Sequence, residues 1–404
     1  LTKKHTLRVI KIMEQNSSYL AKVARPQLSR YYTRKHIFER LDGFCEYPVI
    51  LVTGPAGCGK TTLVNSYLKE RKIRCLWYQV DEGDADPATF FYYMRLAAKG
   101  IDQKRRKPLP LLTPEYQPGL ATFTIRYFEQ LYNHMPRHSV IVFDNYQEVS
   151  ISSLFHMLIR HGLSQVPQGM HVVLISRTAP PAELVRLEAN RQMRTLGWKD
   201  LKLQPDETAG IVNLLASGPL SETRIREIHD LAAGWMAGVV LMVQKAGIED
   251  VDQEVFAVQA PEAIFDYFAS EVFSKMDDST QDFLLKTACL PRMSPSLAAE
   301  LSGNNNAGWI LSDLSRHNYF VERRFSIEPV YSYHPLFRTF LLSQAKKDLP
   351  CEDIPKLMNH AACLLERYGQ VDEALDLILK ANNWEKLVVF LMQHAPAMLE
   401  QGRH

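Results

Sequence analysis

The fold of this chain is decided by the stretch GPAGCGKTT at residues 54–62. It fits the pattern G-x-x-x-x-G-K-[ST] without a gap. An apolar run at residues 48–53 precedes it and predicts a buried strand, while residues 63–71 have a helical pattern. Strand, glycine-rich loop and helix in this order are the context that a phosphate-binding loop requires. The stretch therefore predicts a nucleotide-binding α/β domain.

The residue types of this loop suit phosphate binding. Glycines let the backbone curl so that its N–H groups face phosphate oxygens, and the start of the following helix adds a partial positive charge. Lys60 is expected to reach the β- and γ-phosphates of ATP, and the Thr61 hydroxyl to hold Mg²⁺. The candidate nucleotide-binding residues of the loop are Gly54, Ala56, Gly57, Cys58, Gly59, Lys60, Thr61 and Thr62.

Two further strands end in charged residues that fit the same site. The apolar run at residues 139–144 ends in Asp144, which is expected to orient Mg²⁺ from the side opposite Thr61. The apolar run at residues 171–176 is followed by Arg177, a cation placed either to sense a γ-phosphate or to form a surface ion pair. The candidate catalytic residues are therefore Lys60, Asp144 and Arg177, and the candidate metal ligands are Thr61 and Asp144.

These strands belong to one predicted domain at residues 22–203. With a further strand at residues 73–80, and a short one at residues 193–196 or 201–203, they predict a mostly parallel sheet with helices on both faces.

Two segments of this domain each have two possible interpretations. Tyr32 and Arg34 lie in a basic, aromatic segment before the first strand, and either contact the base or ribose or simply begin a solvated helix. The acidic stretch Asp81-Glu82-Gly83-Asp84 follows the second strand, at the sheet edge where α/β proteins bind ligands. Turn formation and helix capping explain the same residues equally well.

The pattern becomes helical after the α/β domain. Three helical stretches punctuated by glycine predict a small helical domain at residues 204–262. Residues 263–348 continue as short helices and an alternating stretch, which predict a winged helix. Residues 349–404 predict amphipathic helices with very short turns, the start of a helical arm of TPR-like hairpins, and residues 1–21 are a weakly patterned extension.

A winged helix can bind DNA through its third helix, here expected at residues 306–317. That helix offers only Arg316 and His317 against Asp313, a poor electrostatic footprint for a phosphate backbone. We therefore expect an intramolecular role for this winged helix.

Charge, hydropathy and cysteine content limit the classes of protein to which this chain can belong. The 47 Lys and Arg residues against 45 Asp and Glu, over 404 residues, give no global field that would mark nucleic-acid or membrane-surface binding. No run of about 18 apolar residues occurs, which predicts no membrane span. The six cysteines are scattered, and one is Cys58 inside the loop, so we expect a reducing, cytoplasmic compartment.

Together these features resemble the STAND class of signal-transducing P-loop ATPases, and within it the MalT-like, LuxR-family transcription regulators of bacteria. The resemblance covers residues 22–404. It rests on an ordered set of motifs: Ala24-Arg25-Pro26, the loop itself, Trp77, Asp81-Glu82-Gly83-Asp84, Asp144-Asn145-Tyr146-Gln147, Ser176-Arg177, Gly234-Trp235 and Tyr333-His334-Pro335-Leu336-Phe337.

The resemblance implies the domains predicted above, followed by a superhelical sensor and often a C-terminal helix-turn-helix. Both would lie beyond residue 404, so the chain is expected to be part of a longer protein. The inducer would act on that sensor, and DNA would be bound only by that helix-turn-helix. The resemblance also places His334 against the β-phosphate of bound ADP.

The leading hypothesis for function is an ATP/ADP switch, with a closed ADP state and an ATP state that opens and self-associates. One departure from the family bears on turnover, because Asn145 stands where a second acid is common, and an amide cannot act as a general base. Hydrolysis is then weak, unless Glu82, Asp84 or Glu148 substitutes. The alternatives are a STAND scaffold of defence type, whose output is assembly, and a metabolic P-loop phosphotransferase.

Overall fold

The computed structural model describes residues 21–28, 30–99, 108–216, 218–246, 262–324, 328–350, 352–381 and 383–400. Most of the predicted extension at residues 1–21, the basic run at residues 104–107 and the end of the predicted helical domain lie outside these residues. The chain divides into two compact units. The first contains Leu1–Leu214 and Trp235–Ala237, and the second Leu215–Gly234 and Gly238–His404.

The first unit is built on a five-stranded sheet in the order β2-β3-β4-β1-β5, and all its strand pairs are parallel. The strands are β1 (Val49–Thr53), β2 (Cys75–Gln79), β3 (Val140–Asp144), β4 (His171–Ser176) and β5 (Met193–Leu196). Because helices cover both faces of a parallel sheet, the middles of its central strands are apolar, and polar residues stand only at strand ends, as His171, Thr53, Ser176 and Asp144 do. Every side chain of β3 is buried.

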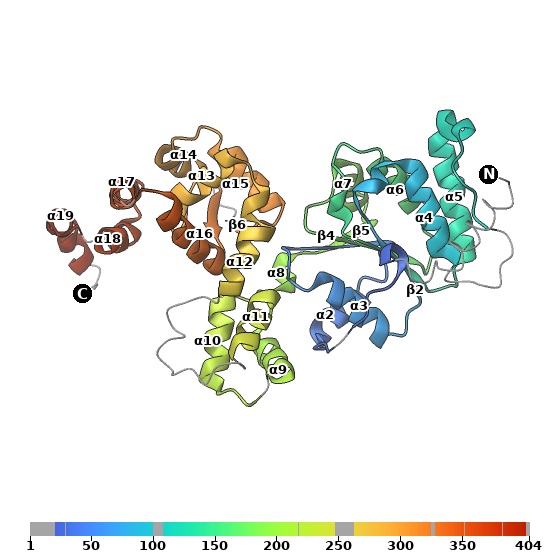
Figure 1. The fold of residues 1–404 in the computed structure, drawn as a ribbon, viewed down its shortest axis with the longest axis horizontal. Coiled ribbons are helices and arrows are strands. Elements are labelled where there is room, and N and C mark those ends of the chain that lie inside the picture. The colour runs from blue at the N-terminus through green and yellow to red at the C-terminus, as the bar shows by residue number, and fades with distance from the viewer. Residues whose placement is uncertain are drawn as a thin grey trace, which may run out of the picture. The chain divides into compact units, whose positions relative to one another are not determined.

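Helices flank the sheet on two sides, as Figure 1 shows, with α2 and α3 on one face and α4, α5, α6 and α7 on the other. The helices of this unit are α2 (Lys35–Asp42), α3 (Lys60–Glu70), α4 (Pro87–Lys99), α5 (Leu120–His134), α6 (Phe155–Leu163), α7 (Ala182–Ala189), α8 (Trp198–Leu201) and α9 (Pro205–Leu215). The predicted α/β class with a mostly parallel sheet is confirmed.

Parallel register brings the functional strand ends to one edge. Thr53 pairs with Ser176, and Phe143 pairs with Leu174, so β1, β4 and β3 end side by side. The loop after β1, Asp144 and Arg177 therefore share the carboxyl edge of the sheet, where open α/β sheets bind ligands.

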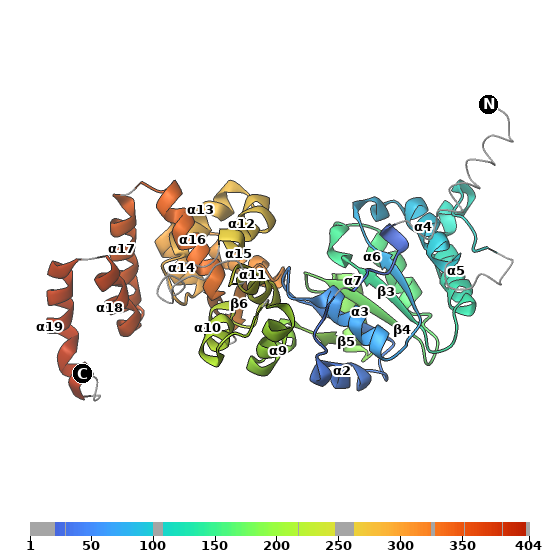
Figure 2. The ribbon, with the colours of Figure 1, turned by 60° about the horizontal axis from the view of Figure 1, so that its bottom comes forward.

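Where the structure describes it, the second unit is helical apart from one hairpin and an isolated bridge between Met293 and Tyr331 (Figure 2). Its helices are α10 (Glu222–Ala232), α11 (Met236–Ala246, whose first two residues group with the first unit), α12 (Glu262–Glu271), α13 (Asp278–Thr287), α14 (Pro295–Ser302), α15 (Ala307–Arg316), α16 (Pro335–Asp348), α17 (Asp353–Arg367), α18 (Val371–Lys380) and α19 (Trp384–Glu400). The hairpin pairs β6 (Val321–Arg324) with β7 (Val330–Tyr333), antiparallel. α13, α14, α15 and the hairpin form the predicted winged helix.

Capping explains where the winged-helix elements begin. The Asp277 side chain accepts a hydrogen bond from the Thr280 N–H and caps α13, and Ser294 caps α14 in the same way ahead of Pro295. Phe268, Phe320 and Phe337 pack their rings together at the centre of this part, where the ring centroids of Phe268 and Phe320 are 4.9 Å apart.

Two local expectations differ from the structure. The second strand begins at Cys75 rather than Ile73, because Lys72 takes a left-handed φ of 54° in the turn before it. Of the two segments proposed for a last short strand, Met193–Leu196 forms it, whereas residues 201–203 form no strand, since Leu201 is the last residue of α8. No helix among the described residues is long and apolar enough to cross a membrane.

Candidate nucleotide-binding site

The glycine-rich loop connects β1 to α3 and depends on two left-handed glycines. Gly57 has φ 69° and Gly59 has φ 85°, backbone angles that residues with a side chain rarely adopt. Gly59 is the N-cap of α3, so the free N–H groups of the first turn face the loop. Cys58 is buried, and burial raises the pKa of its thiol, whereas the Thr62 side chain is exposed.

Lys60 is folded back onto the loop that precedes it. Its Nζ donates to the carbonyl oxygens of Gly54 at 2.7 Å and Pro55 at 2.9 Å, and the side chain is 8% exposed. Burial lowers the pKa of Lys60, because the ammonium loses water. A phosphate oxygen at the loop would compensate that loss with a charge-assisted hydrogen bond.

Thr61 and Asp144 are brought together although they are far apart in sequence. The Thr61 hydroxyl donates to Asp144 Oδ1 at 3.1 Å. Burial raises the pKa of Asp144, and the hydroxyl of Thr61 and the N–H of Asn145 act in the opposite direction. A hydroxyl beside a buried carboxylate suits Mg²⁺, which binds few protein groups and completes its shell with phosphate and water. The described residues contain no cluster of three or more metal-ligating side chains.

Arg177 lies at the same edge. Its backbone N–H donates to Gln147 Oε1 at 2.9 Å, which ties the end of β4 to the turn after β3. The charge of Arg177 contributes to the lowered pKa of Lys60, so its field reaches the loop. Asn145, between Asp144 and that turn, has a left-handed φ of 59°.

The segment Trp235–Ala237 holds the loop from the outside, a contact that the sequence analysis missed. Trp235 Nε1 donates to the Ala56 carbonyl at 2.9 Å, and the Ala237 N–H donates to the Gly57 carbonyl at 2.9 Å. A Cβ on Gly57 would lie 2.7 Å from the Cβ of Ala237, so only glycine permits this approach. The Gly234-Trp235 motif was noted in the sequence, but nothing in it signals a partner 179 residues away.

Arg34 makes its contacts within the protein, and its expected contact with a nucleotide stays a prediction. It is 4% exposed, and it donates to both carboxylate oxygens of Glu207 at 2.8 Å and to the Leu201 carbonyl at 2.9 Å. This buried, bidentate pair fixes α2 against α9, so the structure favours a structural role for Arg34. Tyr32 lies against Gly210 of α9, where an added Cβ would be 2.1 Å from its ring.

The acidic stretch after β2 forms a cap and an anchor. The Asp81 side chain accepts from the Gly83 N–H, and the Asp81 N–H donates to the fully buried Asp84, a reciprocal cap. Asp84 also accepts from the Tyr78 hydroxyl at 2.6 Å and from Lys22 Nζ at 2.9 Å. Of the two open interpretations, these contacts favour turn formation and capping.

His334 lies in the second unit. Its side chain is 2% exposed, and its ring meets that of Phe320 edge to face at 5.7 Å. It is the N-cap residue of α16, ahead of Pro335. Its expected contact with ADP stays a prediction.

Comparison with known proteins agrees with this architecture. Residues 46–178 match the model of an AAA domain family, and residues 269–353 match that of the MalT winged helix domain. Over 382 residues, 93% of the chain, the sequence is 27% identical to the HTH-type transcriptional regulator MalT of Cronobacter sakazakii. The chain spans 42% of the length of that relative.

A solved structure shares the fold. The Walker-type ATPase PABY2304 of Pyrococcus abyssi superposes with a TM-score of 0.56 at 14% identity, covering 78% of this chain and 98% of its own. The predicted resemblance to P-loop ATPases and MalT-like regulators is confirmed.

Proposed function

From this MalT-like, P-loop architecture, we propose that the chain is the nucleotide-responsive part of a transcription regulator. In this proposal residues 54–62 bind ADP or ATP, and the second unit responds to which of the two is bound. The observation that supports it best is a pair of hydrogen bonds to the loop. Trp235 donates to the Ala56 carbonyl, and Ala237 donates to the Gly57 carbonyl. A loop that rearranges around phosphates must move the groups bonded to it.

Lys60 and the loop N–H groups would bind the phosphates, while Thr61 and Asp144 would hold Mg²⁺. A Mg²⁺ ion held by these two side chains would supply positive charge that neutralises part of the phosphate charge. Arg177 would sense the γ-phosphate, since it follows β4 at the same edge. Loss of the γ-phosphate would then change the hydrogen bonds that Lys60 and the loop N–H groups make to phosphate.

The proposed cycle has a closed ADP state and an open ATP state that self-associates. A ligand shifts such an equilibrium only by its difference in affinity between the states. The segment Trp235–Ala237 supplies a route for that difference, because it contacts the loop and continues into α11. Inducer and DNA would be bound by other parts of the full-length protein.

The test is to identify the nucleotide that co-purifies with the chain, and then to measure ADP and ATP affinity for wild type and Lys60→Ala. We expect ADP in the extract, and a loss of about 1.5–3 kcal/mol of binding free energy in the variant, typical of a charged hydrogen bond. Lys69→Ala is the matched control, an exposed lysine on the same helix. Equal affinities in wild type and Lys60→Ala would reject the proposed site.

A further inference from the structure

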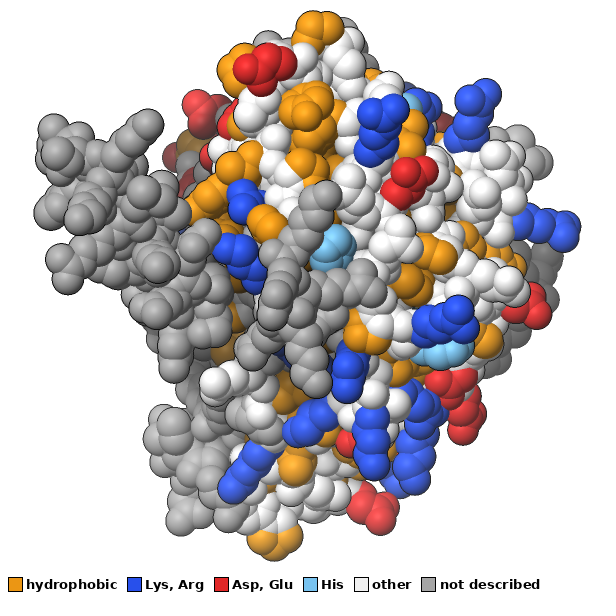
Figure 3. All heavy atoms as spheres, turned by 90° about the vertical axis from the view of Figure 1, so that its right-hand side faces the viewer, with side chains coloured by type: hydrophobic (Ala, Val, Ile, Leu, Met, Phe, Trp, Pro, Cys, Tyr) orange, Lys and Arg blue, Asp and Glu red, His pale blue; other side chains and the backbone are white. Residues whose placement is uncertain are grey.

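The edge of the sheet opposite the glycine-rich loop carries a row of cations. Lys72 and Arg74 precede β2, Arg137 precedes β3, and Arg191 and Arg194 lie at the start of β5, and all five are exposed. We call these five residues the basic edge. Figure 3 looks onto this end of the first unit, and Lys and Arg side chains gather in the lower part of the view.

Backbone hydrogen bonds show that the strand starts form one continuous edge, on which the five cations stand at β2, β3 and β5, with none of the five at β4 or β1. The Val140 N–H donates to the Arg74 carbonyl, the His171 N–H to the Ser139 carbonyl, the Val172 N–H to the Pro48 carbonyl, and the Val49 N–H to the Gln192 carbonyl. These bonds cross from β2 to β5 through all five strands. With neighbouring strands about 4.8 Å apart, the row extends for about 19 Å.

The turns that lead into these strands have an unusual conformation for their residues. Lys72, His138 and Arg191 have φ of 54°, 59° and 56°, in the left-handed region where glycine and asparagine are more common. Each stands within three residues of the start of β2, β3 or β5. Cationic residue types therefore occupy positions that ordinary turn chemistry would give to other residues.

The charge of the basic edge is not neutralised by neighbours. Arg71, next to Lys72, pairs with Asp42, but none of the five has a carboxylate partner among the described residues. Glu46 is the one acid in the turns at residues 43–48, 71–74, 136–139, 167–170 and 189–192. A second acid, Glu188, accepts a hydrogen bond from Thr195 at 3.3 Å.

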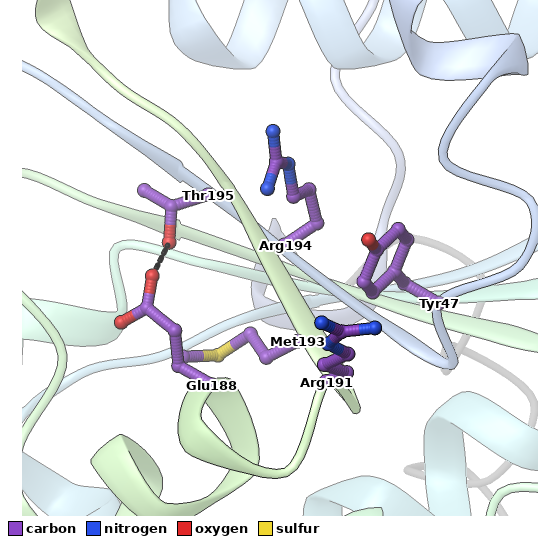
Figure 4. Close-up of a pocket in the computed structure, with 6 residues that line it drawn as sticks. All are labelled: Tyr47, Glu188, Arg191, Met193, Arg194 and Thr195. Carbon is purple, nitrogen blue, oxygen red and sulfur yellow. Dashed lines mark hydrogen bonds between the residues drawn. The ribbon is translucent and has the colours of Figure 1, made fainter.

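One end of the row is hollowed into a pocket of about 340 Å³, lined by Tyr47, Glu188, Arg191, Met193, Arg194 and Thr195. In Figure 4, Arg191, Arg194 and Tyr47 lie on one side of the β5 ribbon, and Glu188 with Thr195 on the other. The Arg194 guanidinium lies over the rings of Phe44 and Tyr47, at 5.7 and 6.0 Å from their centroids. Such stacking holds a guanidinium in place while its N–H groups stay available.

From this geometry we propose that the basic edge binds the phosphate backbone of a nucleic acid, without reading its sequence. Arginine provides four of the five charges, and its planar fork of donors matches phosphate oxygens. A span of about 19 Å corresponds to roughly six base pairs at 3.4 Å each. An acidic protein or a membrane is a poorer fit, because protein interfaces have apolar cores and stable membrane anchoring adds apolar groups to a basic patch. None of the exposed large hydrophobic side chains found among the described residues belongs to these turns.

The proposal goes beyond the expectation that DNA is bound only through a helix-turn-helix outside this chain. A nearly balanced total charge does not exclude a local row of one sign. The contact would be independent of the nucleotide site, since the basic edge lies at the opposite ends of the strands.

The test measures binding of a fluorescent 30-base-pair duplex of mixed sequence to the 404-residue chain, by anisotropy at several salt concentrations. Wild type is compared with the triple variant Arg74→Gln/Arg137→Gln/Arg191→Gln. The matched control is Lys35→Gln/Arg126→Gln/Lys199→Gln, which removes three exposed charges from helices outside the basic edge. ADP binding in each variant reports that the first unit is folded.

We expect wild-type binding that weakens with salt, and about tenfold or greater loss for the triple variant at low salt. The slope of the logarithm of the DNA-binding constant against the logarithm of the salt concentration should become shallower by about 0.9 for each phosphate contact removed. Absence of duplex binding by wild type, or equal affinities of the triple variant and the control, would overturn the proposal. Binding to phosphatidylserine vesicles in place of the duplex would also overturn it and assign the edge to a membrane.

Discussion

Two buried charges define the site at the scale of single residues, and burial opposes both. Burial lowers the pKa of Lys60 and raises the pKa of Asp144, so it disfavours the charged form of each side chain. Such costs are typical of functional sites, where stability is exchanged for binding.

This cost predicts the behaviour of Asp144→Asn. Because the folded-state pKa of Asp144 lies above its usual value of 3.8, ionisation destabilises the fold. The penalty is absent below about that pH and grows as the pH rises through the folded-state pKa. The variant should unfold at a higher temperature at pH 7, by about 2–4 °C per kcal/mol, and show no gain near pH 3.5. It should also lose Mg²⁺-dependent ATP binding. Thermal unfolding at both pH values measures the first effect, and a variant less stable at pH 7 would contradict it.

Asn145 predicts slow turnover. Its amide cannot take a proton from water, and its φ of 59° is also accessible to aspartate. We expect ATP hydrolysis by wild type far below 10 per second, a rate typical of metabolic enzymes. Asn145→Asp should increase the rate, and phosphate release measures both.

A wild-type rate near that of metabolic enzymes would favour the phosphotransferase alternative over a switch. Asn145→Ser, equally unable to act as a general base, is the control that separates base chemistry from a change of backbone.

At the scale of elements, the start of α11 holds the loop. Trp235→Phe keeps an aromatic ring but leaves the Ala56 carbonyl without its donor. We expect the free energy of unfolding to fall by about 1–3 kcal/mol, the cost of a buried group left unsatisfied, and ADP to bind more weakly. Trp309→Phe is the control, since Trp309 is 68% exposed on α15. Denaturant unfolding and ADP titration are the measurements, and unchanged values for Trp235→Phe would remove this contact from the account.

Elements with a local signal were predictable from the sequence. Capping by Ser294, Pro295 and Asp277, and the apolar strands β1, β3 and β4, carry their evidence within a few residues. The partners of Arg34 and Trp235 could not be predicted, because Glu207 and Ala56 are brought to them only by the folded chain. The acidic stretch was ambiguous for the same reason, since Tyr78 and Lys22 decide what Asp84 does.

At the scale of the whole molecule, the contact of His334 with the β-phosphate of ADP, which the resemblance implies, is a prediction that can be tested. A hydrogen bond from its imidazole to the β-phosphate would exist only in the closed state. His334→Ala should therefore weaken ADP retention more than ATP binding, and increase the fraction of open or self-associated protein. ADP dissociation rates and sedimentation velocity measure the two effects.

Because His334 is buried on Phe320, His334→Ala can also disturb the winged helix itself. His334→Gln, which keeps a hydrogen-bond donor, distinguishes the two causes. Faster ADP release in the alanine variant with near-normal release in the glutamine variant supports the contact. Normal ADP retention in both variants would assign His334 a structural role only.

The central claim is that nucleotide at the glycine-rich loop is sensed by Trp235–Ala237. Hydrogen exchange of the Ala237 amide tests it directly, because that N–H donates to the Gly57 carbonyl. The account predicts slower exchange when nucleotide is bound, and different rates with ADP and with ATP. Identical exchange in the free, ADP and ATP forms, under conditions where binding is saturated, would contradict it.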